Sequence, residues 1–196
     1  GFRETDLPAQ EVVSKLQLPA GHYADEVLLF RILNVPSPVL RPDPSQTYVF
    51  IDSEFTDLTA PQLISIGAVA TDSTAIYAEL QGWNVERASA FVQSTVMPLL
   101  DGDAVPVELG AQALTEWLEQ RSRRTPTTII SDSGFDRWAL AELFGREDLP
   151  PNVRWQRVPI AYEALDEAAQ HLKLRRHHAL DDARALRHLV LETQSA

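Results

Sequence analysis

Acidic residues in three separated segments of the sequence have the types and order needed to bind divalent cations together. Asp52 and Glu54 lie in the run VFIDSE, Asp136 ends the run GFD, and His177 and Asp182 lie in the run HHALDD. Magnesium prefers hard oxygen ligands, usually one or two carboxylates with waters and phosphate oxygens. Two such ions about 3.5–4 Å apart can activate a water and stabilise the leaving oxygen of a displacement at phosphorus. The residue types therefore predict a two-magnesium centre for phosphodiester cleavage.

The pair Asp52 and Glu54 follows a segment that is typical of a β-strand. Residues 47–51 are aromatic or β-branched and come after a cluster of Pro, Asp and Ser. Side chains alternate faces along a strand, so positions 52 and 54 project to the same side at its end. Two carboxylates that close repel each other unless a cation lies between them. Taken alone, however, an acid-x-acid pair is more often a solvated turn.

The other two segments also have ordinary structural explanations. Asp136 at a helix start would complement the helix dipole, and His177 and Asp182 could be a loop residue and a surface helix residue. Two neighbours compete for the same roles. Asp132 ends the segment before Asp136, and His178 lies four residues before Asp182, a spacing that allows a metal pair on a helix. The joint appearance of all three segments at element edges favours the metal centre.

In their order and spacing, the three segments resemble the motifs of the DEDDh exonucleases of the RNase H-like superfamily. That family carries D-x-E on its first strand, F-D at a helix start and H-x-x-x-x-D, which correspond here to DSE, FD and the run from His177 to Asp182. The resemblance implies that four acids bind two Mg²⁺ or Mn²⁺ ions: Asp52, Glu54, Asp136 and Asp182. It also implies that His177 is the general base on the attacking water. It selects His177 over His178, and leaves Asp132 as a helix cap or a residue behind the ligands.

Within this family, the chain looks most like the short bacterial and phage 3'-5' exoribonucleases, which are related to oligoribonuclease and ribonuclease T. Their first motif, D-x-E-F, continues into a Leu-Ile-Ser-Ile-Gly strand, and here DSEF is followed by LISIG at residues 63–67. The likeness covers about residues 47–193, and Asp57 replaces a glycine that many members carry. It implies hydrolysis from the 3' end with release of nucleoside 5'-monophosphates. RNA is the expected polymer.

Three of the four residues after Glu54 are candidates for contact with the terminal nucleotide. Stacking of a base on an aromatic side chain contributes about 1–3 kcal/mol and tolerates any sequence. Phe55 is the candidate for stacking, Leu58 for wedging against the same nucleotide, and Thr56 lies between them. For Phe55 and Leu58, a role in the hydrophobic core is equally consistent with the sequence.

The net charge of −11 is unusual for a protein that binds nucleic acid, because Lys and Arg normally neutralise the phosphates. Two bound divalent ions would offset part of this charge where the scissile phosphate must lie. Arg175 and Arg176, immediately before His177, are the candidates for phosphate binding. An acidic chain with a local basic segment predicts engagement of a short or terminal stretch of nucleic acid with a free 3' end.

The elements expected around these residues have the RNase H-like order. Strands are expected at residues 47–54, 62–71 and 75–83, and then helices at about 85–97 and 107–122. A buried strand at 127–130 leads into a helix at about 135–145 that Gly145 ends, and a strand at 153–160 precedes helices at about 161–171 and 179–193. The predicted class is α/β, with a mixed sheet of three successive antiparallel strands followed by parallel strands, flanked by helices.

A chain of 196 residues is expected to form one exonuclease domain, residues 47–196, after an N-terminal extension. The extension, residues 1–46, ends in a stiff segment with Pro36, Pro38, Pro42 and Pro44. The family resemblance does not explain it, and the alternatives are packing on the exonuclease, formation of a homodimer, or binding of a partner.

Composition excludes several other classes of protein. The absence of cysteine excludes disulfides and thiolate metal sites. No apolar run approaches the roughly 18 residues of a membrane span, and a cytoplasmic location is expected. Two alternatives to the exoribonuclease remain: a 3'-5' exodeoxyribonuclease with the same site, and a non-catalytic module that binds nucleic acid or acts as a scaffold.

Overall fold

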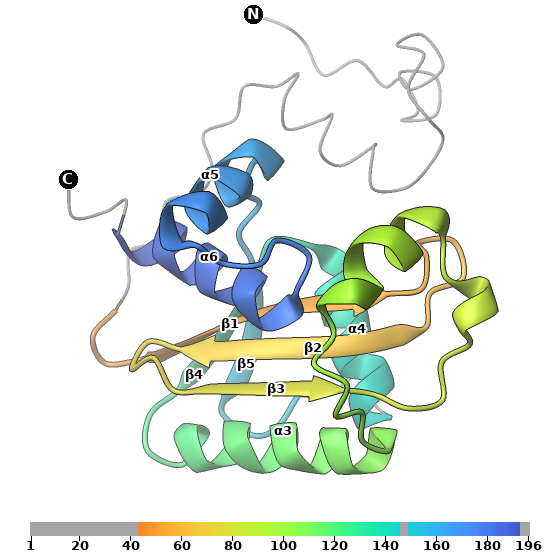
Figure 1. Cartoon of the computed structure of the whole chain (residues 1–196). Helices are drawn as coiled ribbons and strands as arrows, with labels where there is room; N and C mark the ends of the chain where they lie inside the picture. Colours follow the sequence, from red (N-terminus) through yellow and green to blue (C-terminus); the bar gives the residue numbers. More distant parts are fainter. Residues whose placement is uncertain (1–42, 146–148, 193–196) are drawn as a thin grey trace, which may run out of the picture. The chain divides into compact units, whose positions relative to one another are not determined.

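A computed structural model describes residues 43–145 and 149–192 (Figure 1). The chain divides into two compact units, and the unit described below consists of Ser37–Asp57 and Pro61–Ala196. Leu58–Ala60 are grouped with the N-terminal residues in the other unit. The predicted extension over residues 1–46 lies almost entirely outside the described residues, so its role stays a prediction.

Within the described residues, five strands form one mixed sheet in the order β3-β2-β1-β4-β5. The strands are β1 (Thr47–Phe55), β2 (Leu63–Ala70), β3 (Ala75–Glu79), β4 (Thr127–Ser131) and β5 (Val153–Arg157). The pairs β1–β2 and β2–β3 are antiparallel, whereas β1–β4 and β4–β5 are parallel. The predicted mixed sheet, with antiparallel strands first and parallel strands after them, is confirmed.

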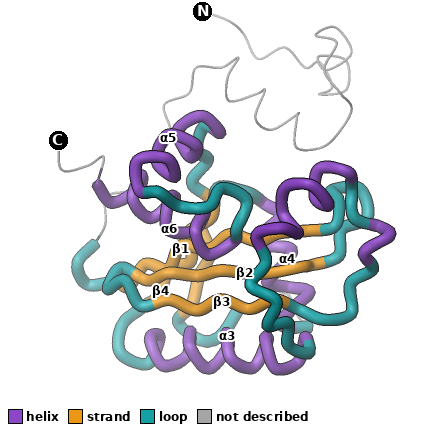
Figure 2. Tube along the Cα trace, in the orientation of Figure 1, coloured by secondary structure: helices purple, strands orange, loops and turns teal. Residues whose placement is uncertain are grey.

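Strand β1 is buried on both faces and joins two hydrophobic cores. Phe50 packs in a cluster with residues of α5 (Tyr162–Leu172) and α6 (Ala179–Glu192), whereas Ile51 packs with residues of α3 (Val107–Ser122) and α4 (Gly134–Phe144). Figure 2 shows these helices around the central strands. Because side chains alternate along a strand, Asp52 and Glu54 follow Phe50 on the α6 face, and Ser53 follows Ile51 on the α4 face.

Helix α4 matches the helix predicted at about 135–145, but its cap is Ser133 and not Asp132, which the sequence had offered as a cap. The Ser133 hydroxyl accepts a hydrogen bond from the amide of Phe135 at 3.1 Å, which caps the helix. Gly145 follows the last residue with φ +62°, the left-handed conformation that glycine adopts at helix ends. Asp136 is thereby fixed in the first turn of the helix.

The prediction of one continuous helix at about 85–97 is wrong. The structure has instead two short 3₁₀ helices, η1 (Val85–Arg87) and η3 (Met97–Leu99), on either side of a π-helix, η2 (Val92–Val96). Ala88 is extended, with φ −68° and ψ 130°, and interrupts the helical path after η1. Pro98 lacks the amide that a continuing helix needs, so the segment ends in a single tight turn.

Two expected strands are shorter than the sequence suggested. β3 ends at Glu79 rather than at residue 83, because the chain turns through Gly82, which has φ +94°. β5 ends at Arg157 rather than at residue 160, because Pro159 cannot donate a hydrogen bond to a ladder.

Helix α6 touches the sheet backbone at Gly67, the last residue of the LISIG segment. Gly67 pairs with Asp52 across β1 and β2. A Cβ atom at Gly67 would lie 2.3 Å from both N and Cα of Leu180 and 2.5 Å from the carbonyl carbon of Ala179. Backbone atoms cannot move aside as a flexible side chain would. Only glycine therefore allows the first turn of α6, which carries Asp182, to lie this close to β2.

Replacing Gly67 with alanine is expected to push α6 away from the sheet. Overpacking of this kind costs about 1–3 kcal/mol, so the free energy of unfolding of Gly67→Ala should fall by that amount in a denaturant titration. Gly134→Ala is the control, because a Cβ atom there meets nothing within 4 Å and alanine suits a helix. Equal unfolding free energies for Gly67→Ala and the unsubstituted protein would contradict the close approach.

Candidate metal centre

The C-terminal end of β1 delivers polar side chains to both faces of the sheet. Asp52 and Glu54 lie on the α6 face, and Ser53 lies on the α4 face between them. The Ser53 hydroxyl donates a hydrogen bond to Oδ1 of Asp136 at 2.6 Å. This bond ties the first turn of α4 to the strand, so two elements that are distant in sequence meet at this point.

The structure brings the predicted ligands together in two groups. Glu54, His177 and Asp182 form the first, in which the ligand atoms all lie within 4.8 Å of one another. Asp52, Asp132 and Asp136 form the second under the same limit. Asp132 thus lies beside Asp136 and does not replace it, although the sequence had placed it behind the ligands. All five residues of the predicted catalytic set lie in these two groups.

The donor set fits a divalent ion of the magnesium or manganese type. Oδ2 of Asp136 and Oδ1 of Asp182 are buried and have no hydrogen-bond partner. A buried carboxylate oxygen without a partner is costly, and a bound cation would remove that cost. Oxygen ligands in this number are those that Mg²⁺ and Mn²⁺ prefer.

Burial and like charges make these carboxylates hold protons when no cation is present. Burial, and next the charge of Asp136, raises the pKa of Asp52 well above its ordinary value. Burial, and next Asp132, does the same to the pKa of Asp136. Burial and then Asp182 raise the pKa of Glu54 to about 8. A cation would relieve this repulsion and keep the groups ionised.

His177 is held at the end of the connection between α5 and α6. Its backbone is left-handed, with φ +65°, and its amide donates to Oδ2 of Asp182 at 3.0 Å. Its Nε2 lies 3.1 Å from the hydroxyl of Tyr162, and its ring meets Phe91 edge-on with the centroids 5.0 Å apart. Burial and the charge of Arg176 lower the pKa of His177, so the imidazole is neutral near pH 7 and can accept a proton.

The alternative ligand His178 lies elsewhere. Its side chain is buried, with 2% of the residue exposed, and its ring stacks on Tyr77 with the centroids 4.5 Å apart. Its ring nitrogens lie 3.8 Å and 3.9 Å from the carboxylates of Asp101 and Asp181, beyond hydrogen-bond distance. His177, not His178, therefore shares a group with Asp182, in agreement with the family spacing.

Phe55 and Thr56 are both buried in the structure, and their predicted contacts with a nucleotide stay a prediction. Phe55 is 7% exposed, and its ring packs against the rings of Phe135 and Trp138, at centroid distances of 6.1 Å and 5.6 Å. Thr56 is 0% exposed, and its hydroxyl accepts a hydrogen bond from the amide of Gln62 at 3.1 Å. Phe55 takes the core role that the sequence had left open. Leu58 belongs to the other unit, and its contact stays a prediction.

Arg175 and Arg176 are both engaged with acidic side chains of the chain itself. Arg175 contacts Asp181 at 2.8 Å and Asp101 at 2.9 Å. Arg176 contacts Asp166 at 2.7 Å and also pairs with Asp182. A role in phosphate binding stays a prediction, and it would require either guanidinium group to exchange a carboxylate for a phosphate.

Two aromatic residues beside His177 were missed from the sequence. Phe91, next to η2, is 52% exposed, and Tyr162, the first residue of α5, is 37% exposed. Neither residue belongs to a motif, and their distance from Asp52 along the sequence does not distinguish them from other aromatic residues. Only the tertiary fold places them on His177, so no local pattern could have identified them.

The fold and the two ligand groups define an α/β domain of RNase H-like type with an acidic centre at the end of its first strand. No family model matches the chain. Two relatives from Mycobacterium tuberculosis, of strains CDC 1551 and H37Rv, are both named 3'-5' exoribonuclease. Each is 34% identical over 110 residues, which cover 53% of this chain and 66% of the relative. The match therefore spans just under two thirds of the relatives' length.

Solved structures of exonucleases share the fold. A 3'-exonuclease that recognises the 3' end of a histone mRNA stem-loop matches with a TM-score of 0.58 and 13% identity, over 96% of this chain and 80% of that one. Exonuclease I matches with a TM-score of 0.53 and 12% identity, over 76% of this chain and 41% of that one. A zinc-bound complex of Escherichia coli exonuclease I with single-stranded DNA gives 0.51 and 14%, over the same shares.

These findings confirm the predicted fold class and bear out the resemblance to 3'-5' exonucleases. At 12–14% identity, the structural matches speak for the fold alone. Within the residues that the structure describes, no helix is both long and apolar enough to cross a membrane.

The raised pKa values predict how the stability of the metal-free protein depends on pH. Between the ordinary carboxyl pKa and the value of about 8 for Glu54 or about 6 for Asp182, the folded state holds protons that the unfolded state releases. Stability should therefore decrease as the pH rises through this range. Melting curves with a chelator should give a lower Tm near pH 8 than near pH 6. Added Mn²⁺ should raise Tm more at the higher pH. If Tm depended on pH equally steeply in Glu54→Gln, the raised pKa could not be assigned to Glu54.

Asp132 is expected to contribute to metal binding because it shares a group with Asp52 and Asp136. Asp132→Asn should weaken Mn²⁺ binding by about 10- to 100-fold in a calorimetric titration, the range found for groups that support a metal site. Asp103→Asn, at an exposed position, is the control. Unchanged Mn²⁺ affinity in Asp132→Asn would return Asp132 to the role of a residue behind the ligands, since Ser133 caps the helix.

Proposed function

We propose that the chain is a metal-dependent 3'-5' exoribonuclease that hydrolyses phosphodiester bonds from the 3' end and releases nucleoside 5'-monophosphates. The observation that carries this proposal is the meeting of two acidic groups from three distant segments at the end of β1. The names of the two sequence relatives support both the polarity and the polymer.

Four carboxylates would hold two Mg²⁺ or Mn²⁺ ions: Asp52, Glu54, Asp136 and Asp182. When bound, such ions lower the pKa of a coordinated water and stabilise the charge on the leaving oxygen. The protein's part is to fix the carboxylates before the substrate arrives. Ser53 does this for Asp136, and the amide of His177 does it for Asp182.

His177 would take the proton of the attacking water on its imidazole. The lowered pKa leaves the ring neutral at physiological pH, which is the form that a general base needs. Burial raises the pKa of Tyr162, so its hydroxyl stays protonated and can donate to Nε2 of His177. This contact, with the edge of Phe91, would orient the ring until substrate binds.

A DNA-directed exonuclease with the same centre is the second candidate. The fold neighbours include a complex with single-stranded DNA as well as a 3'-exonuclease that recognises RNA. The sequence motifs identify no reader of a 2'-hydroxyl. A non-catalytic module is less well supported, because all five predicted site residues assemble.

Digestion of labelled oligomers tests the proposal. Asp52→Asn should abolish cleavage, and His177→Ala should lower kcat by about 100- to 10,000-fold, as expected for loss of a general base. RNA and DNA of matched sequence, labelled at either end, are incubated with and without Mn²⁺. Stepwise shortening from the 3' end of RNA that requires Mn²⁺ is the expected result, whereas faster digestion of DNA would favour the second candidate.

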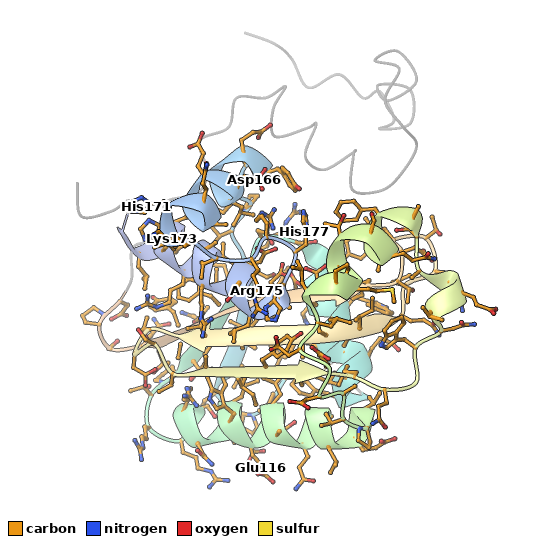
Figure 3. All side chains as sticks on the ribbon, viewed as in Figure 1. Glu116, Asp166, His171, Lys173, Arg175 and His177 are labelled. Atoms are coloured by element: carbon orange, nitrogen blue, oxygen red, sulfur yellow. The ribbon has the colours of Figure 1, made fainter. Side chains whose placement is uncertain are left out.

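Controls for this experiment come from the exposed surface. Glu116→Gln on α3 and His171→Ala on α5 change another carboxylate and another histidine away from the centre, as Figure 3 shows. Both should keep full activity. Near-normal turnover by purified Asp52→Asn would refute the two-metal assignment, and shortening from the 5' end would refute the polarity.

A further inference from the structure

Arg176 lies at the junction between the metal centre and helix α5. Its Nη1 pairs with Oδ2 of Asp182, and its Nε contacts Oδ1 of Asp166 at 2.7 Å. Its guanidinium also lies over the ring of Tyr162, with the Cζ atom 4.8 Å from the ring centroid. Arg176 therefore links a predicted metal ligand on α6 to two residues of α5.

The contacts of Asp182 are divided between its two oxygens. Oδ2 accepts from Arg176 and from the amide of His177, whereas Oδ1 is buried without a partner. One oxygen is thus occupied by the chain's own donors, and the other is left for a ligand.

We propose that Arg176 is a positioning residue that reserves Oδ2 of Asp182, presents Oδ1 to the divalent ion, and holds His177 in place through α5. This inference rests on the proposed metal centre. It differs from the phosphate-binding role predicted from the sequence, because Arg176 acts here on the protein and not on the substrate.

The contacts around His177 form a closed ring. Arg176 binds Asp182, the His177 amide binds the same carboxylate, the His177 imidazole meets the Tyr162 hydroxyl, and Tyr162 packs under Arg176. His177 has a left-handed backbone, which costs energy outside glycine, so its conformation depends on these contacts. In Figure 3, Asp166 and His177 lie on the side of the sheet that α5 and α6 cover, beside the connection between these helices that carries Arg175.

The geometry calls for arginine and not lysine. The guanidinium is planar and presents several donors in a fixed fork, so it can bind two carboxylates at once while it stacks on an aromatic ring. An ammonium group is a point charge and cannot hold Asp166, Asp182 and the Tyr162 face in the same way. Lysine should therefore not substitute for Arg176.

A fixed cation beside the centre has opposite effects on ion affinity and on catalysis. Its charge repels an incoming metal ion, so its removal should not weaken metal binding. Its removal should, however, release Asp182 and His177 from their positions and slow the chemical step. A residue that binds substrate phosphate would instead affect KM.

The test compares Arg176→Gln and Arg176→Lys with Arg184→Gln in the full chain. Arg184 also pairs with an acidic residue of α6, Asp181, at 2.8 Å, but that residue belongs to neither ligand group. Mn²⁺ affinity is measured by calorimetry without nucleic acid, and kcat and KM are measured on a 3'-labelled RNA oligomer. Both Arg176 variants should lose at least about tenfold in kcat, as for other groups that orient a ligand, with unchanged KM. Mn²⁺ binding by Arg176→Gln should be no weaker than that of wild type, because this variant loses the repelling charge. Arg184→Gln should match wild type.

Asp166→Asn provides a second variant that leaves Asp182 and its pairing with Arg176 untouched. Asp166 is exposed enough to be replaced without loss of the fold, and the substitution removes only the outer anchor of Arg176. It should also lower kcat with no change in Mn²⁺ affinity. Unchanged kcat in the Arg176 variants, a higher KM with normal kcat, or weaker Mn²⁺ binding by Arg176→Gln would each overturn the positioning role.

The Mn²⁺ measurement also separates this inference from the proposed function. A wild-type protein that releases no nucleotides from any oligomer would refute the exonuclease. The positioning role would then still be supported if Asp182→Asn weakens Mn²⁺ binding and Arg176→Gln does not. Weaker binding in both variants would overturn it.

Discussion

Repulsion among carboxylates gathered at the end of β1 is the constraint on which the rest of the structure depends. Five acids of the two ligand groups lie within a few ångströms of their neighbours, and burial raises the pKa of each of them. The protein offsets this cost in two ways. Hydrophobic cores on both faces of β1 stabilise the strand that carries Asp52 and Glu54. The Ser53 hydroxyl satisfies one oxygen of Asp136, and the Arg176 guanidinium and the His177 amide together satisfy one oxygen of Asp182. The oxygens without partners are those that a cation can use.

The same constraint explains why the approach of α6 to the sheet matters. Asp182 reaches Glu54 only because the first turn of α6 lies on the backbone of Gly67. The sequence showed the LISIG segment only as part of a family likeness. The structure gives it a physical reason, since any side chain at its last position would occupy the place of the helix backbone. Gly67, a motif residue without a functional group, thereby controls the position of Asp182, whose carboxylate is a predicted metal ligand.

Sequence reasoning succeeded where a local rule decides the outcome. Strand alternation placed Asp52 and Glu54 on one face, and Gly145 marked the end of α4 through its left-handed backbone. It failed where tertiary packing decides. The register shift after Glu54 accompanies burial of Phe55 against α4, and no local pattern distinguished this outcome from an exposed ring. The segment η1–η3 breaks up where the backbone of Ala88 is extended and at Pro98, although the sequence had predicted one helix at about 85–97. The sequence shows Arg176 only as one of several neighbouring basic residues, and it could not predict that Arg176 pairs with two acids.

The pairing of the basic residues bears on how an acidic chain could act on nucleic acid. With a net charge of −11, the surface repels a polyanion, and Arg175 and Arg176 are already bound to acids of the chain. Under the proposed function, attraction for phosphate would therefore come mainly from the divalent ions and act at the scissile group itself. Affinity that is concentrated at one phosphate does not increase with the length of the polymer, unlike affinity that is spread along a basic groove. A centre of this kind suits a substrate that presents a free end, because only the terminal phosphodiester needs to enter it.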